Sequence, residues 1–368
     1  MADTHHASIP LWSLLAPILG IAFLTLGLFG LIPSDAAPVL IAAGVLLGAA
    51  VFAAVHHAEV LALALGEPFG SILLALAVTV IEVALIVSIM LSGLSGAEEV
   101  ARDTVFSAVM IVLNGVVGLC LVVGGQRHLE QSFQLQGVTA ALSVLGILAV
   151  LALILPNFTV SAEGPVYSKA QLVTTGVMSL ALWAIFVFVQ TIRHRDYFLD
   201  VAPGETETEP ASVPAIPAMI VTGSLVLLVI ALVAVVLLAK KLSGPLDSAI
   251  AAAGMPKAVV GVVIATIVLL PESLAAIRSA VRNRLQNSLN LALGSAIASI
   301  GLTIPAVAVV SLVIDMRVVL GLSSANMTLL ALTLFASVLT LGTGRTTVLQ
   351  GASHLVIFAV FLLLAAEP

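Results

Sequence analysis

Long runs without a charged side chain dominate this sequence. Stretches of more than 20 residues without Asp, Glu, Lys or Arg include 104–126, 131–162, 170–192, 285–314, 318–344 and 346–366. A helix of about 20 apolar residues crosses the roughly 30 Å hydrocarbon core of a bilayer. Only 9% of the residues are charged, whereas a soluble domain has about 25%. The chain is therefore expected to be an integral membrane protein.

The same runs predict an all-α polytopic fold. Leu, Val, Ala and Ile follow one another without the strict alternation of a transmembrane β-barrel. We expect eleven spans, at about 11–32, 36–55, 69–94, 104–125, 138–155, 170–192, 217–239, 257–278, 287–314, 325–342 and 346–365.

An acidic, proline-rich linker divides these spans into two sets. We expect an N-terminal tail with a leading helix at 1–35, a five-helix repeat at 36–193, the linker at 194–216 and a second five-helix repeat at 217–368. An odd number of spans in each repeat inserts the second one upside down. Inverted repeats of this kind are typical of secondary transporters, whose substrate site lies near the bilayer midplane.

Two glutamates lie inside the spans. Glu82 is the only charged residue between Glu67 and Glu98, and Glu272 is the only one between Lys257 and Arg278. A carboxylate at the centre of a membrane helix costs at least about 2.5–3.5 kcal/mol, so it usually marks an ion or proton site. A structural role, such as pairing of Glu272 with Arg278, is the simpler alternative.

The two glutamates occupy similar contexts. Each follows a Gly-x-Pro helix entrance and a β-branched apolar stretch, in GEPFGSILLALAVTVIEVALI and in GMPKAVVGVVIATIVLLPESLAAI. Glu82 is expected near the middle of its span and Glu272 nearer one end, where Pro271 removes a backbone donor and favours a bend.

Buried carboxylates suit competition between a cation and protons. Burial disfavours the charged form of a carboxyl group, so an empty site favours a proton and a bound cation expels it. Two glutamates would neutralise one Ca²⁺, which prefers six to eight oxygen ligands. Further oxygens are available on the spans that follow the glutamates, at Ser107, Asn114, Asn287, Asn290, Ser295, Ser299 and Thr303. Asn114 and Ser295 are the stronger candidates, although polar residues in membrane helices also serve in packing.

Other functions find little support. There is no basic patch for nucleic acid, no Ser/His/Asp set, no HExxH and no Walker sequence, so we expect neither an enzyme nor a bound cofactor. A cation channel would require proton-independent flux and favours rings of acidic residues. His354 is expected to hydrogen-bond inside the helix bundle. Lipid is the expected surrounding, and a homo-oligomer is compatible with the sequence.

Several motifs resemble those of bacterial calcium/proton antiporters of the ChaA type, in the cation/proton exchanger branch of the calcium/cation antiporter superfamily. They are LGEPFG with VIEVALI, RDTVFSAVMIV, LLPESLAAI with NLALGSAIASI, and TGRTTVLQGASHL. The resemblance spans residues 65–355. It implies an eleven-helix fold with two inverted repeats and an acidic segment between them.

The resemblance implies that Glu82 and Glu272 bind cation and protons in turn, and that Ser295 is the small polar residue of the second repeat. The sequence departs from the broader family pattern in having fewer side-chain oxygens: Val78-Thr79 and Val268-Leu269 precede the acids, and Ala298 replaces a glutamine. The two glutamates and the resemblance lead us to expect a Ca²⁺/H⁺ antiporter of a bacterial inner membrane. The smaller number of side-chain oxygens keeps Na⁺(K⁺)/H⁺ exchange open as the alternative.

Overall fold

The computed structural model describes residues 9–31, 36–65, 69–93, 96–199, 216–256 and 258–367. The linker prediction for 200–215 lies outside these residues. The chain forms two compact units, one from residues 1–88 and 204–248 and the other from 89–203 and 249–368. Packing thus groups segments from both halves of the sequence, and the predicted repeat boundaries stay a prediction.

The described residues of the first unit form four long helices. They are α1 (Leu11–Leu28), α2 (Ala37–Leu65), α3 (Phe69–Met90), whose last two residues belong to the second unit, and α8 (Ala218–Ala252), which reaches this unit's boundary at Ser248. Helix α1 packs against α2. The fully buried His57 of α2 lies with its Nε2 3.1 Å from the carbonyl oxygen of Ser13. This contact gives a polar side chain of α2 a partner on α1.

The second unit is a larger helical bundle. Its first helix runs through α4 (Val100–Met110), the π-helical segment η1 (Ile111–Val116) and α5 (Val117–His128). The other helical segments of this unit, in chain order, are α6 (Leu135–Ala149), η2 (Val150–Ile154), η3 (Leu155–Phe158), α7 (Lys169–Phe188), η4 (Val189–Arg193), η5 (Arg195–Phe198), α9 (Ala258–Val281), α10 (Leu285–Val313), α11 (Ser324–Leu341) and α12 (Val348–Ala366). Two short strands, β1 (Gln131–Ser132) and β2 (Arg345–Thr346), pair antiparallel.

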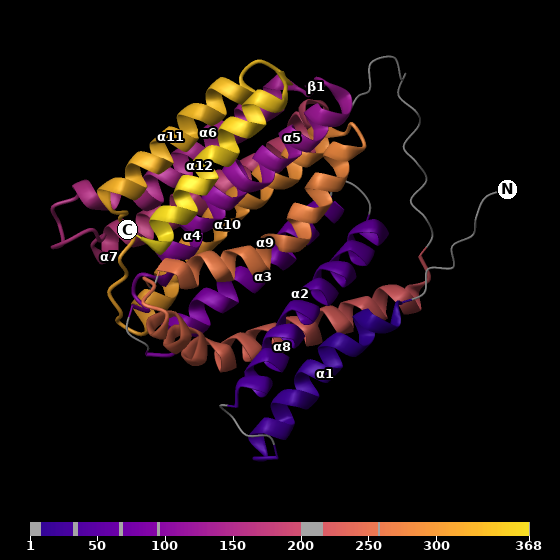
Figure 1. Ribbon diagram of the computed structural model, residues 1–368, viewed down its shortest axis with the longest axis vertical. Helices are drawn as coiled ribbons and strands as arrows, with labels where there is room; N and C mark the ends of the chain where they lie inside the picture. The colour runs from indigo at the N-terminus through magenta and orange to yellow at the C-terminus, as the bar shows by residue number, and fades with distance from the viewer. Residues whose placement is uncertain are drawn as a thin grey trace. The chain divides into compact units, whose positions relative to one another are not determined.

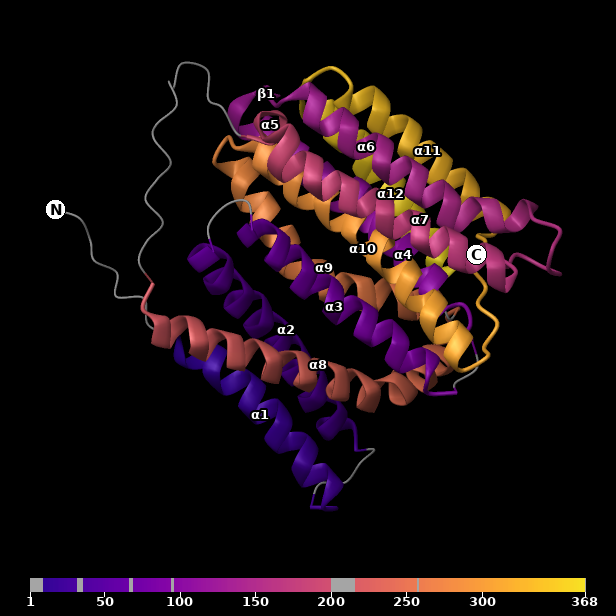
Figure 2. The same ribbon diagram turned by 180° about the vertical axis from the view of Figure 1, so that it is seen from behind.

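Glycines allow close helix packing in this unit. A Cβ added to Gly301 of α10 would lie 2.6 Å from Cβ of Trp183 on α7, and one added to Gly176 of α7 would lie 3.2 Å from Pro305 on α10. Figure 2 shows α7 alongside α10, and Figure 1 shows α12 beside α5. Small residues at helix contacts let backbones approach, as is common in membrane bundles.

The predicted all-α polytopic fold is confirmed. Among the described residues, ten helices are long and apolar enough to cross a membrane, and α3 adds the shorter apolar stretch Leu76–Met90.

Two predicted helix ends are wrong. Helix α2 continues ten residues past the expected end at 55, and α8 continues past 239 to Ala252. Each expected end was placed where polar residues stop an apolar run, at His56-His57 and at Lys240-Lys241. Helix hydrogen bonding continues through these residues, and the His57 side chain has a partner inside the unit.

Candidate functional site

Glu272 and Ser295 meet across two neighbouring helices of the second unit. Glu272 lies on α9 directly after Pro271, and Ser295 lies on α10 in the small-residue run Gly294-Ser295-Ala296. The Ser295 hydroxyl donates to Oε2 of Glu272 at 2.6 Å. Both side chains are partly buried. The structure therefore brings together two of the residues that the sequence singled out.

A hydrogen bond between α9 and α10 joins the two helices close to the turn that connects them. The hydroxyl of Ser288 donates to the carbonyl oxygen of Ala276 at 2.7 Å, and Ser288 is 1% exposed. Ser288 precedes Ser295 by seven residues, or about two helical turns. The anchored hairpin therefore presents the Ser295 hydroxyl to the Glu272 side of α9.

The two glutamates occupy nearly equal positions within their helices. Glu82 is residue 14 of the 22 in α3, and Glu272 is residue 15 of the 24 in α9. The expectation that Glu272 lies nearer one end of its span than Glu82 is therefore wrong. The reason is that α9 extends to Val281, beyond the expected end at 278, and it continues as one helix through Pro271.

Glu82 is a buried residue of the first unit. Its side chain is 3% exposed, and that of Thr79, one turn earlier on α3, is 4% exposed. Each of these side chains has an interaction partner. A carboxyl group and a hydroxyl thus lie about one turn apart on one helix.

Helix α10 continues the polar stripe beyond Ser295. Ser299 and Thr303 follow at four-residue spacing, which keeps them on one helix face, and both are at most 1% exposed. The Thr303 hydroxyl has no hydrogen-bond partner among the described residues. Thr303 lies about 12 Å along the helix from Ser295. That is too far to join Ser295 around one cation.

Asn114 lies in a different hydrogen-bond network of the second unit. It is fully buried in the π-helical segment η1, a conformation that often marks functional positions. Its amide nitrogen donates to Oγ1 of Thr333 on α11 at 2.9 Å, and its amide oxygen lies 3.1 Å from Nδ1 of His354 on α12. The network therefore ties one helix interruption to two other helices.

The chemistry of Asn114 fixes the direction of one of these hydrogen bonds. An amide oxygen only accepts, so Nδ1 of His354 carries the hydrogen toward Asn114. Nε2 lies 2.8 Å from Oγ1 of Thr340, whose hydroxyl also donates to the carbonyl oxygen of Ala336 at 2.8 Å. His354 is fully buried. The prediction that it hydrogen-bonds inside the bundle is confirmed.

Replacing His354 with alanine should destabilise the bundle. The fully buried amide oxygen of Asn114 would lose its partner, and an unsatisfied buried polar group costs about 1–3 kcal/mol. We expect a lower thermal midpoint for the detergent-purified protein. Ser353→Ala is the control, because its exposed hydroxyl donates to the Leu349 carbonyl of its own helix. Equal midpoints for the two variants would contradict a holding role for this network.

The remaining predicted oxygens have mixed surroundings. Asn290 donates to the carbonyl oxygen of Phe198 at 2.6 Å and accepts from Gln286, so it holds η5 against α10. Ser107 lines a cavity next to Asp103, and Asn287 is partly buried. Asp103 was not singled out from the sequence. The feature of the sequence that could have pointed to Asp103 is its position four residues before Ser107, on the helix that also carries Asn114.

Comparison with known proteins identifies a family. The model of the sodium/calcium exchanger protein family matches residues 36–192 and 223–366. The putative ionic transporter y4hA of Sinorhizobium fredii is 55% identical over 366 residues, covering 100% of this chain and 99% of that protein. The sodium-potassium/proton antiporter ChaA of Escherichia coli is 32% identical over 355 residues, covering 95% of each chain.

Solved structures share the fold. Native YfkE superposes with a TM-score of 0.70 at 16% identity, covering 97% of this chain and 100% of YfkE. The H⁺/Ca²⁺ exchanger CAX gives a TM-score of 0.71 at 16% identity, covering 95% of this chain and 87% of that one. The family match covers most of the sequence, and the helices are long enough to span a bilayer. The chain belongs to the sodium/calcium exchanger family and is a multi-pass membrane protein that transports cations by exchange.

Proposed function

We propose that this protein exchanges a metal cation for protons across a bacterial inner membrane, with Glu272 and Glu82 binding cation or protons in turn. The observation that carries the proposal is the 2.6 Å hydrogen bond from Ser295 to Glu272 inside an apolar helix pair. A carboxyl group in such surroundings is costly unless it binds an ion or a proton.

Competition at Glu272 would couple the two fluxes. A proton on the carboxyl group removes its charge, and an arriving cation displaces that proton because carboxylate oxygens prefer the metal once it is dehydrated. The Ser295 hydroxyl can serve both states. It donates to the carboxylate in one state and offers an oxygen lone pair to a cation in the other.

Sodium or potassium is the cation that we favour. The Escherichia coli relative, alike over nearly its whole length, is named as a sodium-potassium/proton antiporter. Among the described residues no group of three or more His, Cys, Asp or Glu gathers in one place. A monovalent ion requires less ligand charge than Ca²⁺, which commonly takes six to eight oxygens.

Calcium is the second candidate. Two membrane glutamates would balance its charge, and the matching family is described as a sodium/calcium exchanger. Asn114 is the proposed additional oxygen ligand. Its amide oxygen faces His354 and keeps a second lone pair.

A transport assay with several cations tests this function. The purified protein would be placed in proteoliposomes with an imposed pH gradient, and Na⁺, K⁺ or Ca²⁺ would be added while a pH dye is followed. We expect Na⁺ or K⁺ to collapse the gradient. Collapse by Ca²⁺ alone would replace the favoured ion and keep the exchange mechanism. Cation flux that leaves the pH gradient intact, or no response to any cation, would overturn cation/proton exchange.

A further inference from the structure

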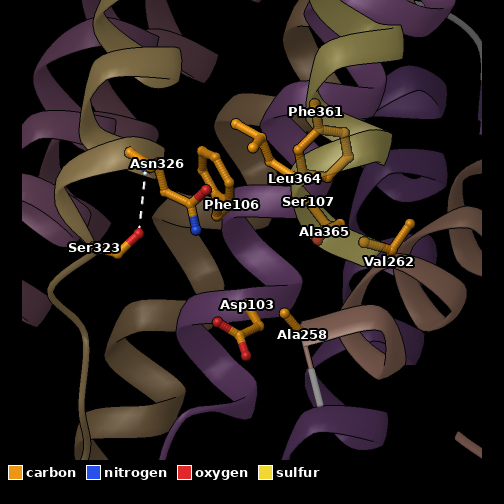
Figure 3. Close-up of a pocket in the computed structure, with 11 residues that line it drawn as sticks. Asp103, Phe106, Ser107, Ala258, Val262, Ser323, Asn326, Phe361, Leu364 and Ala365 are labelled. Carbon is orange, nitrogen blue, oxygen red and sulfur yellow. Dashed lines mark hydrogen bonds between the residues drawn. The ribbon is translucent and has the colours of Figure 1, made fainter. Parts of the chain in front are cut away.

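A cavity of the second unit lies away from Glu272. Its volume is about 280 Å³, and it opens where α4, α9 and α11 begin and α12 ends (Figure 3). Phe106, Val262, Phe361 and Leu364 supply apolar walls. A water molecule takes up about 30 Å³ in the liquid, so the cavity has room for a partly hydrated ion.

Two oxygen-bearing side chains of α4 line this cavity. Asp103 and Ser107 lie one turn apart, and Figure 3 shows the Asp103 side chain beside Ala258 at the start of α9, with its carboxylate pointing away from Ala258. Ser107 is 2% exposed, and it lines the cavity together with Asp103. Its hydroxyl can donate to a ligand in the cavity or offer it an oxygen lone pair.

The local charge favours a cation. Arg102 donates from Nε to Oδ1 of Asp103 at 2.8 Å and also forms an ion pair with Glu99 at 3.2 Å. One guanidinium thus serves two carboxylates, and the Asp103 side chain also lines the cavity. The first turn of α4 supports a negative charge at Asp103. Burial opposes that charge, and a bound cation would offset the cost of burial.

The cavity is distinct from the Glu272 site but shares its helix. A Cβ added to Gly261 of α9 would lie 2.9 Å from Cβ of Asp103, so α4 and α9 touch at this point. Gly261 and Glu272 are eleven residues apart, or about 16 Å along the helix. One ion cannot contact both carboxylates across that distance.

We propose that this cavity is an accessory cation site, in which Oδ2 of Asp103 and Oγ of Ser107 bind a partly hydrated Na⁺, K⁺ or Ca²⁺ before transport. The apolar walls strengthen the attraction between the carboxylate and the ion by lowering the local dielectric constant. The proposal rests on the proposed function in one respect only, namely that the bound ion is the one transported.

Direct binding tests the site without requiring transport. The full chain carrying Glu82→Gln and Glu272→Gln would be purified, and its equilibrium binding of radiolabelled Na⁺ and Ca²⁺ measured. We expect residual binding that weakens at least about tenfold on adding Asp103→Asn, the loss of one charge-assisted contact. Ser107→Ala should weaken the residual cation binding less than Asp103→Asn does. If the Asp103→Asn variant does not fold, the Ser107→Ala variant tests the site in its place. Glu98→Gln is the matched control, because this exposed acid of the same segment does not line the cavity.

Transport then links the site to exchange. In wild-type background, Asp103→Asn should raise the KM for the cation while the maximal rate at saturating cation stays the same, and Glu98→Gln should leave both unchanged. Residual binding that is absent, or that Asp103→Asn and Ser107→Ala leave unaltered, would overturn the accessory site. Failure of the wild type to move protons would overturn the exchange function. The binding measurement would still test the cation site in the cavity, because it does not depend on transport.

Discussion

Glutamine at position 272 should abolish cation-dependent collapse of an imposed pH gradient. The substitution keeps the size of the side chain but removes the group that binds a cation or a proton, so neither ion can be carried. The pH-dye assay in proteoliposomes measures the result, and Glu82→Gln is expected to give the same loss. The Glu272→Gln variant should remain folded, because glutamine can still accept from Ser295 in place of Oε2 of Glu272.

A surface substitution provides the matched control for these variants. Glu163→Gln makes the same chemical change at an exposed position between η3 and α7, and it should transport as the wild type does. Normal exchange by either Glu82→Gln or Glu272→Gln would contradict the two-glutamate mechanism. Loss of exchange in Glu163→Gln would show that the assay reports a general charge effect.

Ser295→Ala should have a smaller effect of the same kind. A hydrogen bond to a charged group contributes about 1.5–3 kcal/mol, which corresponds to about 10- to 100-fold in an equilibrium constant. We expect the cation concentration for half-maximal exchange to change by about tenfold or more. Ser143→Ala is the control, because that exposed hydroxyl donates to the Ala140 carbonyl within α6. An unchanged cation dependence would remove Ser295 from the site.

Replacing Gly351 should give a large loss of stability. An added Cβ would lie 2.6 Å from the backbone nitrogen of Val122 and 2.8 Å from the carbonyl oxygen of Gly118. Both are backbone atoms of α5 and cannot rotate away, so α12 must move. Overpacking typically costs 1–3 kcal/mol and occasionally more. His354 lies one turn after Gly351, so the displacement should also break its contact with Asn114.

Thermal unfolding of Gly351→Val in detergent measures this effect. Gly146→Ala serves as the control, because no atom lies within 4 Å of the added Cβ and its position on α6 is helical. Alanine there should leave stability unchanged or raise it by up to about 1 kcal/mol. A Gly351→Val midpoint as high as that of Gly146→Ala would show that α5 and α12 are not closely packed at this crossing.

Hydropathy predicted the helices better than it predicted their ends. The run that stops at Lys240 and Lys241 was taken as the end of a helix, yet α8 continues to Ala252. Hydropathy reports where a segment can contact lipid. Helix hydrogen bonds also form where the side chains are polar, and therefore the last turns of α2 and α8 were missed.

The site was only partly accessible from the sequence. Glu272 and Ser295 were singled out, and they meet because they lie on consecutive helices joined by a short turn. Asn114 and Thr333 are 219 residues apart and meet across helices that are distant in sequence. No local spacing gives that contact. Asp103 was overlooked because an acid beside Arg102 reads as an ordinary ion pair.

The sequence by itself determined that this chain forms membrane helices with two embedded acids. A bilayer core has no water to satisfy a free backbone, so long apolar runs must become helices, and each acid within them stands out by its cost. Only the tertiary structure decided that Ser295 faces Glu272, that His354 holds Asn114, and that Asp103 and Ser107 share a cavity. These contacts depend on how helices approach and rotate against one another, and small residues such as Gly261 and Gly351 permit that approach without specifying the partner.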